Sequence, residues 1–150
     1  MSLVIGYGNS LRSDDGAGIA VAEAIAEWPG NEFRTIACHQ LLPELAAELA
    51  NEQMVIFVDA YPAPNSEDVG VELRFLSPEA TTLHPHSLTP ATLLGLCQQL
   101  YGRVPTAYWL LIPGHEWHFS EQLSEATLAE VQQALWLIRN WNDREALCTS

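Results

Sequence analysis

The chain has 150 residues, enough for one domain with a full core and too few for two such domains. It is 48% hydrophobic and 17% charged, and nineteen acidic against six basic residues give a formal net charge of −13. This composition excludes a disordered chain, and the negative charge disfavours sequence-independent binding to nucleic acids. No apolar run reaches the roughly 18 residues of a membrane helix, so we expect no membrane span.

The N-terminal segment and the cysteines indicate the compartment. The first six residues lack the basic and apolar regions of a signal peptide, so we expect a cytoplasmic protein. The three cysteines are odd in number, widely spaced and without a CxxC pair, which predicts reduced thiols instead of disulfides or a zinc cluster. Core packing is the expected role of Cys38 and Cys97, while Cys148 lies near the C-terminus.

The first half of the chain alternates predicted strands and helices. Residues 3–5 read as a buried strand that ends in a glycine turn, and residues 33–38 as a second strand. Between them Ser13 is the expected N-cap of a helix that ends at Pro29. Its apolar face would comprise Val21, Ile25 and Trp28.

A second helix and the clearest strand follow. Pro43 suits the first position of a helix, whose apolar stripe would be Leu42, Leu45 and Leu49. Residues 54–58 are continuously apolar and rich in β-formers, which predicts a strand buried on both faces that ends at Asp59.

The second half continues the alternation. Residues 69–76 alternate apolar and charged side chains, as in a half-exposed edge strand. A helix should begin at Thr89 and end near Gly102, and residues 107–112 should form a buried strand. A last helix of roughly 20 residues would present Leu128, Val131, Leu135 and Ile138 to the core.

These elements predict an α/β fold: a three-layer sandwich with a twisted, mostly parallel sheet of about five strands, one of them an antiparallel edge, and helices on both faces. In such sheets the ligand site lies at the carboxyl ends of the strands, where the strand order reverses. The polar residues after Ile5 and after Val58 are therefore the first candidates for a site.

The glycine-rich segment 6–18 combines two signals. The Gly6-Tyr7-Gly8 turn does not complete a dinucleotide fingerprint, because Leu11 stands where the third glycine would fall. Asp14 and Asp15 are more informative, although acids in the first turn of a helix also commonly complement its dipole.

The remaining candidates are Asp59 and the histidines. A carboxylate at the end of a buried strand either caps a neighbouring segment or points into the ligand crevice. His84 and His86 lie just before the helix expected at Thr89. A surface or structural role is the default for the other histidines, and the HxxH spacing of two of them is a weak metal signal without a helix: His39, His115 and His118.

Two carboxylates and one imidazole at strand ends and helix starts form a mixed oxygen and nitrogen donor set. Such a set suits a borderline divalent ion such as nickel or zinc, and three protein ligands leave positions open for water or substrate. A pair of aspartates can also polarise water for peptide hydrolysis, because a neighbouring like charge raises the pKa of one carboxyl.

Four motifs follow one another along the first 100 or so residues: Gly6-x-Gly8-Asn9-x-Leu11-x-x-Asp14-Asp15-Gly16-x-Gly18, Gln40-Leu41-Leu42-Pro43-Glu44-Leu45, Val58-Asp59-Ala60, and a histidine followed by Ser87-Leu88 before a helix. In these motifs and their order the sequence resembles the [NiFe]-hydrogenase maturation endopeptidases.

The resemblance implies one protease domain over residues 1–150, a monomer, and removal of a C-terminal peptide from the hydrogenase large-subunit precursor after nickel insertion. It assigns the metal contacts to Asp15, Asp59 and His86, with His84 as the alternative to His86, and Asp15 or Asp59 as the group that activates water. The nickel would belong to the substrate and mark it for recognition, although zinc or another divalent ion can occupy such a site. Many family members have glutamate at the first position, so the shorter Asp15 can alter reach or metal preference.

Two other interpretations remain open on the sequence alone. The same three residues could hold a resident zinc or cobalt ion in a self-contained hydrolase. A non-enzymatic α/β module could instead bind a nucleotide or another small ligand at the Gly6–Gly8 turn, although the missing glycine and the acidic surface argue against it.

Overall fold

The computed structural model describes residues 2–30, 33–64, 70–80 and 88–141. His84, His86 and Cys148 lie outside these ranges. The described residues form one five-stranded sheet in the order β2-β1-β3-β5-β4. The strands are β1 (Ser2–Tyr7), β2 (Phe33–Cys38), β3 (Met54–Pro62), β4 (Glu72–Leu76) and β5 (Thr106–Gly114). The helices are the 3-10 turn η1 (Ser13–Gly16) and α1 (Ala17–Ala26), α2 (Leu45–Ala50), α3 (Pro90–Tyr101) and α4 (Glu125–Arg139).

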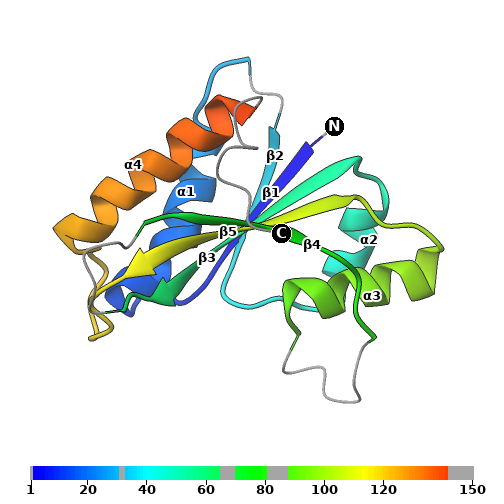
Figure 1. Cartoon of the computed structure of the whole chain (residues 1–150), viewed down its shortest axis with the longest axis horizontal. Helices are drawn as coiled ribbons and strands as arrows, with labels where there is room; N and C mark the ends of the chain where they lie inside the picture. The colour runs from blue at the N-terminus through cyan, green and yellow to red at the C-terminus, as the bar shows by residue number, and fades with distance from the viewer. Residues whose placement is uncertain (1, 31–32, 65–69, 81–87, 142–150) are drawn as a thin grey trace.

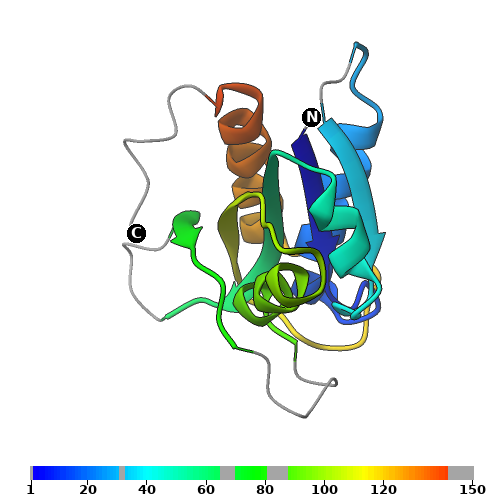
Figure 2. The same cartoon turned by 90° about the vertical axis from the view of Figure 1, so that its right-hand side faces the viewer.

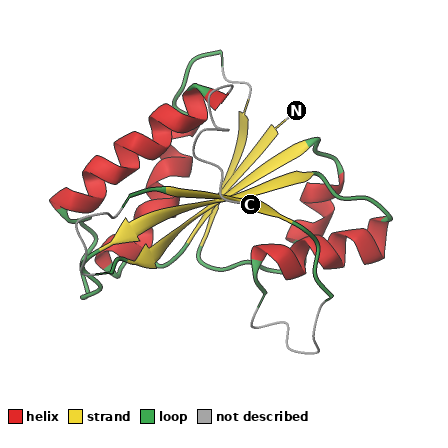
Figure 3. Ribbon diagram, viewed as in Figure 1, coloured by secondary structure: helices red, strands yellow, loops and turns green. Residues whose placement is uncertain are grey.

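The helices cover both faces of the sheet, which confirms the predicted three-layer α/β fold. Helices α1 and α4 contact each other on one face, and α2 and α3 contact each other on the other (Figures 1 and 3). Each face has its own apolar core, because the continuous apolar strands send alternate side chains to opposite sides. Within β3, for example, Ile56 packs toward α1 and α4, and Phe57 packs toward α2 and α3. No helix of the described residues is both long and apolar enough to cross a bilayer.

Strand order reverses between β1 and β3. The chain places β2 on one side of β1 and then β3 on the other, and all three strands are parallel. The pairing of β1 with β3 ends at Gly6 opposite Val58. The prediction that the third strand ends at Asp59 is wrong: β3 continues to Pro62, because residues 59–62 pair with β5. Strand β5 likewise extends to Gly114, beyond its predicted end. Asp59 is therefore the first β3 residue beyond this pairing with β1.

The predicted edge strand is confirmed as β4, which is antiparallel to β5. Leu73 is fully buried, whereas Phe75 on the same face is 46% exposed. Phe75 makes an edge-to-face contact with Tyr108, with 5.6 Å between the ring centroids. The outermost strand is thus only partly covered by the core, as expected for an edge.

The boundaries of α3 agree with the prediction. Thr89 caps the helix through a reciprocal hydrogen-bond pair with Thr92, and Pro90 occupies the first turn. The helix ends at Gly102, which adopts a left-handed conformation with φ of 74°.

Four helix details were predicted wrongly. Ser13 is not an N-cap: it lies in η1 with φ of 49°, and its hydroxyl donates to the Gln122 carbonyl. Pro43 is not the first residue of a helix, because α2 begins at Leu45. Leu128 does not face the core and is 46% exposed. The buried face of α4 instead includes Val131, Ala134, Leu137 and Ile138. Over the described residues α4 spans 15 residues, not about 20.

Candidate functional site

Asp15 and Asp59 lie together at the carboxyl ends of β1 and β3. Asp15 belongs to η1 and Asp59 to the extension of β3, and the two carboxylates are close enough for their charges to interact. Each is oriented by a backbone donor: the Asn9 N–H donates to Asp15 Oδ2 at 2.9 Å, and the Ala60 N–H donates to Asp59 Oδ1 at 2.8 Å. The structure therefore brings both predicted aspartates to the point where the strand order reverses.

The surroundings of Asp59 favour its protonated form. Burial raises the pKa of the Asp59 carboxyl to about 6, and the negative charge of Asp15 acts in the same direction. Hydrogen bonds from the Ala60 N–H and the Tyr7 side chain oppose this increase. Burial and the nearby Asp59 carboxylate also raise the pKa of Tyr7 far above its ordinary value, so the Tyr7 hydroxyl stays a hydrogen-bond donor.

Tyr7 is a site residue that the sequence did not single out. The sequence placed it in the glycine turn after residues 3–5, whereas in the structure it is the last residue of β1. The available signal was its place between Gly6 and Gly8, since a side chain at the carboxyl end of a central strand faces the ligand crevice. Its phenol interacts with the carboxylate of the neighbouring strand.

The glycines around the site are required by backbone packing. A Cβ atom at Gly6 would overlap the Gly18 carbonyl, and one at Gly18 would overlap the Val58 carbonyl. At Gly8, where φ is 143°, a Cβ atom would overlap the Asp15 carbonyl. The chain itself thus fills the space at these glycines, which argues against a phosphate-binding role for the Gly6–Gly8 turn.

The substitution Gly18→Ala should destabilise the fold, because its methyl group meets the fixed backbone of β3 instead of a movable side chain. We expect a loss of about 3 kcal/mol in the free energy of unfolding, measured by urea denaturation. Gly70→Ala is the matched control, since a Cβ atom there meets nothing within 4 Å, and it should change stability by less than about 0.5 kcal/mol. Equal stabilities of the two variants would contradict this account of the packing.

Asp14 has a structural role that differs from that of its neighbour. Its buried carboxylate accepts hydrogen bonds from the backbone N–H groups of His115, Glu116 and Ser124 and from the Ser124 hydroxyl, at 2.7 to 2.9 Å. Burial alone would raise the pKa of Asp14, but these donors outweigh it and lower the pKa to about 2. Asp14 lies in the first turn of η1, where an acid also complements the helix dipole, and its hydrogen bonds attach the loop after β5 to η1.

Two further contacts hold this loop at the same end of the sheet as the candidate site. The Arg12 guanidinium donates to the Trp117 carbonyl, and the Ser13 N–H donates to the Ser120 carbonyl. Figures 1 and 2 show the loop between β5 and α4 beside the turn that follows β1. Sequence reasoning did not find this contact, because the two segments are about 100 residues apart in the chain.

The metal-binding prediction is only partly covered by the described residues. His86 and its alternative His84 lie outside them, so the third predicted ligand stays a prediction. Within the described ranges, no group of three or more His, Cys, Asp or Glu side chains could hold a metal ion. This includes the HxxH pair His115 and His118, both of which are exposed.

The cysteines in the described part of the chain are free thiols. Cys97 is fully buried and its thiol contacts the Arg103 carbonyl, as expected for a core cysteine. Cys38 is partly buried at the end of β2, and burial raises the pKa of both thiols, which disfavours the reactive thiolate.

Comparison with solved structures shows which proteins share this fold. The hydrogenase maturating endopeptidase HybD from E. coli superposes with a TM-score of 0.76 at 20% sequence identity, over 97% of this chain and 93% of that chain. The [NiFe] hydrogenase maturation protease HybD from Thermococcus kodakarensis gives 0.70 at 19% identity, over 93% and 97% of the two chains. The hydrogenase 2 maturation peptidase from Thaumarchaeota archaeon SCGC_AB-539-E09 gives 0.69 at 20% identity, over 94% and 97%.

The chain has the fold of the hydrogenase maturation endopeptidases. The likeness lies in the structure, because no protein-family model and no curated protein sequence matches this chain. At identities near 20% it extends over almost the whole of each chain, which agrees with the family resemblance of the sequence motifs.

Proposed function

We propose that this protein is an endopeptidase that removes the C-terminal extension of a [NiFe]-hydrogenase large-subunit precursor after nickel insertion. The observation that carries the proposal is the coupled pair of carboxylates, Asp15 and Asp59, at the carboxyl ends of β1 and β3. Two further findings support the proposal. The chain has the fold of solved hydrogenase maturation proteases, and both aspartates belong to the motifs through which the sequence resembles these proteins.

In this proposal the nickel is part of the substrate. Asp15 and Asp59 supply hard oxygen donors and His86 a nitrogen donor, which suits a borderline ion already held by thiolates of the precursor. A cation would also relieve the repulsion between the two carboxylates. Precursor without nickel lacks this anchor and should bind weakly, so the metal serves as a checkpoint.

The same carboxylates can activate water for hydrolysis of the peptide bond. One carboxylate accepts a proton from water as it attacks the scissile carbonyl, and the protonated form can then donate to the leaving amine. Before the substrate's nickel binds, burial holds the pKa of Asp59 at about 6, which favours proton uptake near neutral pH more than in an ordinary aspartate. We therefore assign this role to Asp59, and we propose that the enzyme acts as a monomer in the cytoplasm.

Cleavage of nickel-loaded and nickel-free precursor tests the function directly. We expect the loaded large-subunit precursor to lose its C-terminal peptide and the nickel-free form to be cleaved at least about a hundredfold more slowly, as two or three lost metal contacts imply. The measurement is the change in precursor mass with time at equal enzyme concentration. Equal cleavage of both forms would rule out nickel recognition.

The opposite result would identify a self-contained metallopeptidase. Such an enzyme would purify with about one equivalent of zinc or cobalt, cleave an unrelated peptide and lose this activity with a chelator. Cleavage of neither the precursor nor any peptide would contradict the proposed endopeptidase function itself.

A further inference from the structure

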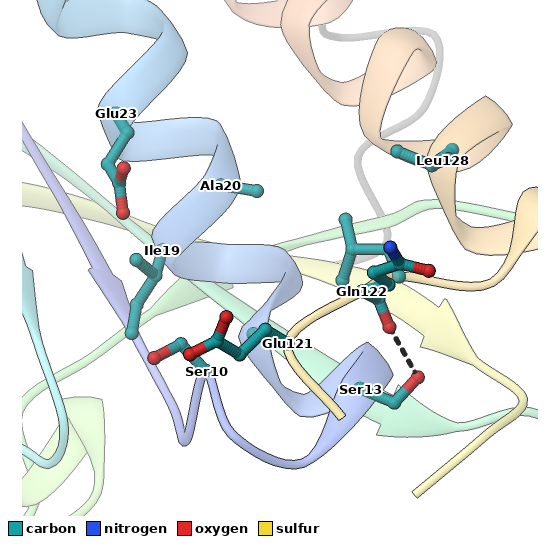
Figure 4. Close-up of a pocket in the computed structure, with 10 residues that line it drawn as sticks. Ser10, Ser13, Ile19, Ala20, Glu23, Glu121, Gln122 and Leu128 are labelled. Atoms are coloured by element: carbon teal, nitrogen blue, oxygen red, sulfur yellow. Dashed lines mark hydrogen bonds between the residues drawn. The ribbon is translucent and has the colours of Figure 1, made fainter. Parts of the chain in front are cut away.

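A hollow of about 470 Å³ lies between α1, η1 and the segment that leads into α4. Figure 4 shows Ile19 and Ala20 on α1 and Leu128 on α4 around it, with Glu23 and Glu121 among the polar residues. Its volume is within the range of protein pockets that bind small ligands or short peptide segments.

The hollow is held open by the contacts that fasten the loop after β5. The Ser13 hydroxyl donates to the Gln122 carbonyl at 2.8 Å, as the dashed line in Figure 4 marks. Next to it, the Ser124 N–H donates to the buried Asp14 carboxylate. Residues 122 and 124, on either side of Leu123, are thus both hydrogen-bonded to η1. This segment forms one wall of the hollow, so the hollow exists before any ligand binds.

The hollow and the aspartate pair share the turn after β1. Ser10 and Gly16 line the hollow. Their chain neighbours belong to the site: the Asn9 N–H donates to the Asp15 carboxylate. A peptide bound with its scissile bond near Asp15 can therefore continue into the hollow along the same turn.

The lining combines apolar side chains with uncompensated negative charge. Glu23 and Glu121 are both exposed at the hollow. The arginines of the described residues interact elsewhere. Arg34 and Arg74 form salt bridges with glutamates outside the hollow. Arg12 donates to the Trp117 carbonyl, Arg139 lies over the Trp28 ring, and Arg103 lies near Cys97. Within the part of the chain that the structure describes, no salt bridge neutralises Glu23 or Glu121.

We infer that this hollow binds a segment of the substrate protein that carries a positively charged side chain next to an apolar one. The apolar side chain would pack on Ile19, Ala20 and Leu128, and the cation would lie between Glu23 and Glu121. This inference rests on the proposed function for the source of the peptide. It adds a specificity subsite that recognises protein sequence and is separate from the aspartate pair.

A peptide titration tests the subsite without any cleavage. The probes are the acetylated, amidated tripeptides Leu-Arg-Leu and Leu-Gln-Leu, titrated into the isotope-labelled full chain and followed by backbone amide chemical shifts. We expect Leu-Arg-Leu to shift the amides of Ile19, Ala20 and Leu123 at millimolar concentration, and Leu-Gln-Leu to bind roughly three to ten times more weakly. The absence of shifts at these amides, or equal shifts with both peptides, would overturn the inference.

The double variant Glu23→Gln/Glu121→Gln removes the two charges and preserves the side-chain shape. It should abolish the preference for Leu-Arg-Leu, and with the nickel-loaded precursor it should raise KM roughly three- to tenfold and leave kcat unchanged. The matched control Glu27→Gln/Glu79→Gln removes two exposed charges outside the hollow and should behave like the native chain.

The outcomes separate the subsite from the proposed function. Loss of the peptide preference in the double variant supports the subsite even if the native chain cleaves no precursor. Precursor cleavage with the same KM in the double variant and the native chain retains the function and overturns the subsite. An equal loss in the double variant and its control would show a long-range charge effect, and this too would overturn it.

Discussion

The substitution Asp59→Asn should lower kcat for the nickel-loaded precursor by two to four orders of magnitude, roughly the contribution of a positioned general base. Asparagine keeps the shape of Asp59 and can still accept the Ala60 N–H, but it can neither accept a proton from water nor carry the negative charge that a nickel ion attracts. The measurement is single-turnover cleavage at saturating enzyme. Retention of native activity would remove Asp59 from the mechanism.

The stability of the same variant shows whether the lost activity is a folding defect. The pKa of Asp59 is about 6 in the folded chain against an ordinary value of 3.8, so the folded state binds the proton more tightly. The contribution of Asp59 to native stability is therefore largest below about pH 4 and is lost as pH rises through 6. Asp59→Asn avoids this loss and should be more stable than the native chain at pH 8, by about 3 kcal/mol. A variant that is less stable at pH 8 would indicate a structural role.

The substitution Asp14→Ala should cost about 3–5 kcal/mol of unfolding free energy and lower the Tm by roughly 10 °C. It leaves the N–H groups of His115 and Glu116, just after β5, and of Ser124, the N-cap of α4, without their acceptor. We expect the loop between β5 and α4 to detach first, since Asp14 joins it to η1. Hydrogen exchange at the three amides measures this detachment.

Two comparisons make the Asp14 prediction specific. Glu125→Gln removes one charge from an exposed position in the first turn of α4 and should change stability by less than about 0.5 kcal/mol. In the native chain, the low pKa of Asp14, about 2 against 3.8, means that its contribution is complete above about pH 4 and is lost as pH falls toward 2. That contribution is about 2 kcal/mol and should be missing from the acid unfolding profile of Asp14→Ala. An unchanged profile would contradict the assignment.

The adjacent acids show how far residue types alone can separate roles. Asp14 and Asp15 occupy the same short turn, and the sequence offers no local reason to treat them differently. Asp14 meets donors from residues 115–124 and becomes a structural anchor, whereas Asp15 meets Asn9 and the charge of Asp59. The distinction depends on contacts between distant segments, which neither spacing nor propensity encodes.

The layered α/β architecture, the antiparallel edge strand and the ends of α3 could all be predicted from the sequence. These features follow from short-range rules: continuous apolar runs form buried strands, and a threonine cap followed by proline starts a helix. The sequence also indicated Asp59 and the Asp14–Asp15 pair, because they follow strands whose carboxyl ends meet in a parallel sheet, and the family resemblance singled out Asp15.

Other features are visible only in the folded chain: β3 continues beyond Asp59, the Tyr7 side chain interacts with the Asp59 carboxylate, and Asp14 is buried. The acidic hollow belongs with them, since its walls come from opposite ends of the chain. Burial and charge coupling depend on which segments pack together, and only tertiary folding brings those segments into contact.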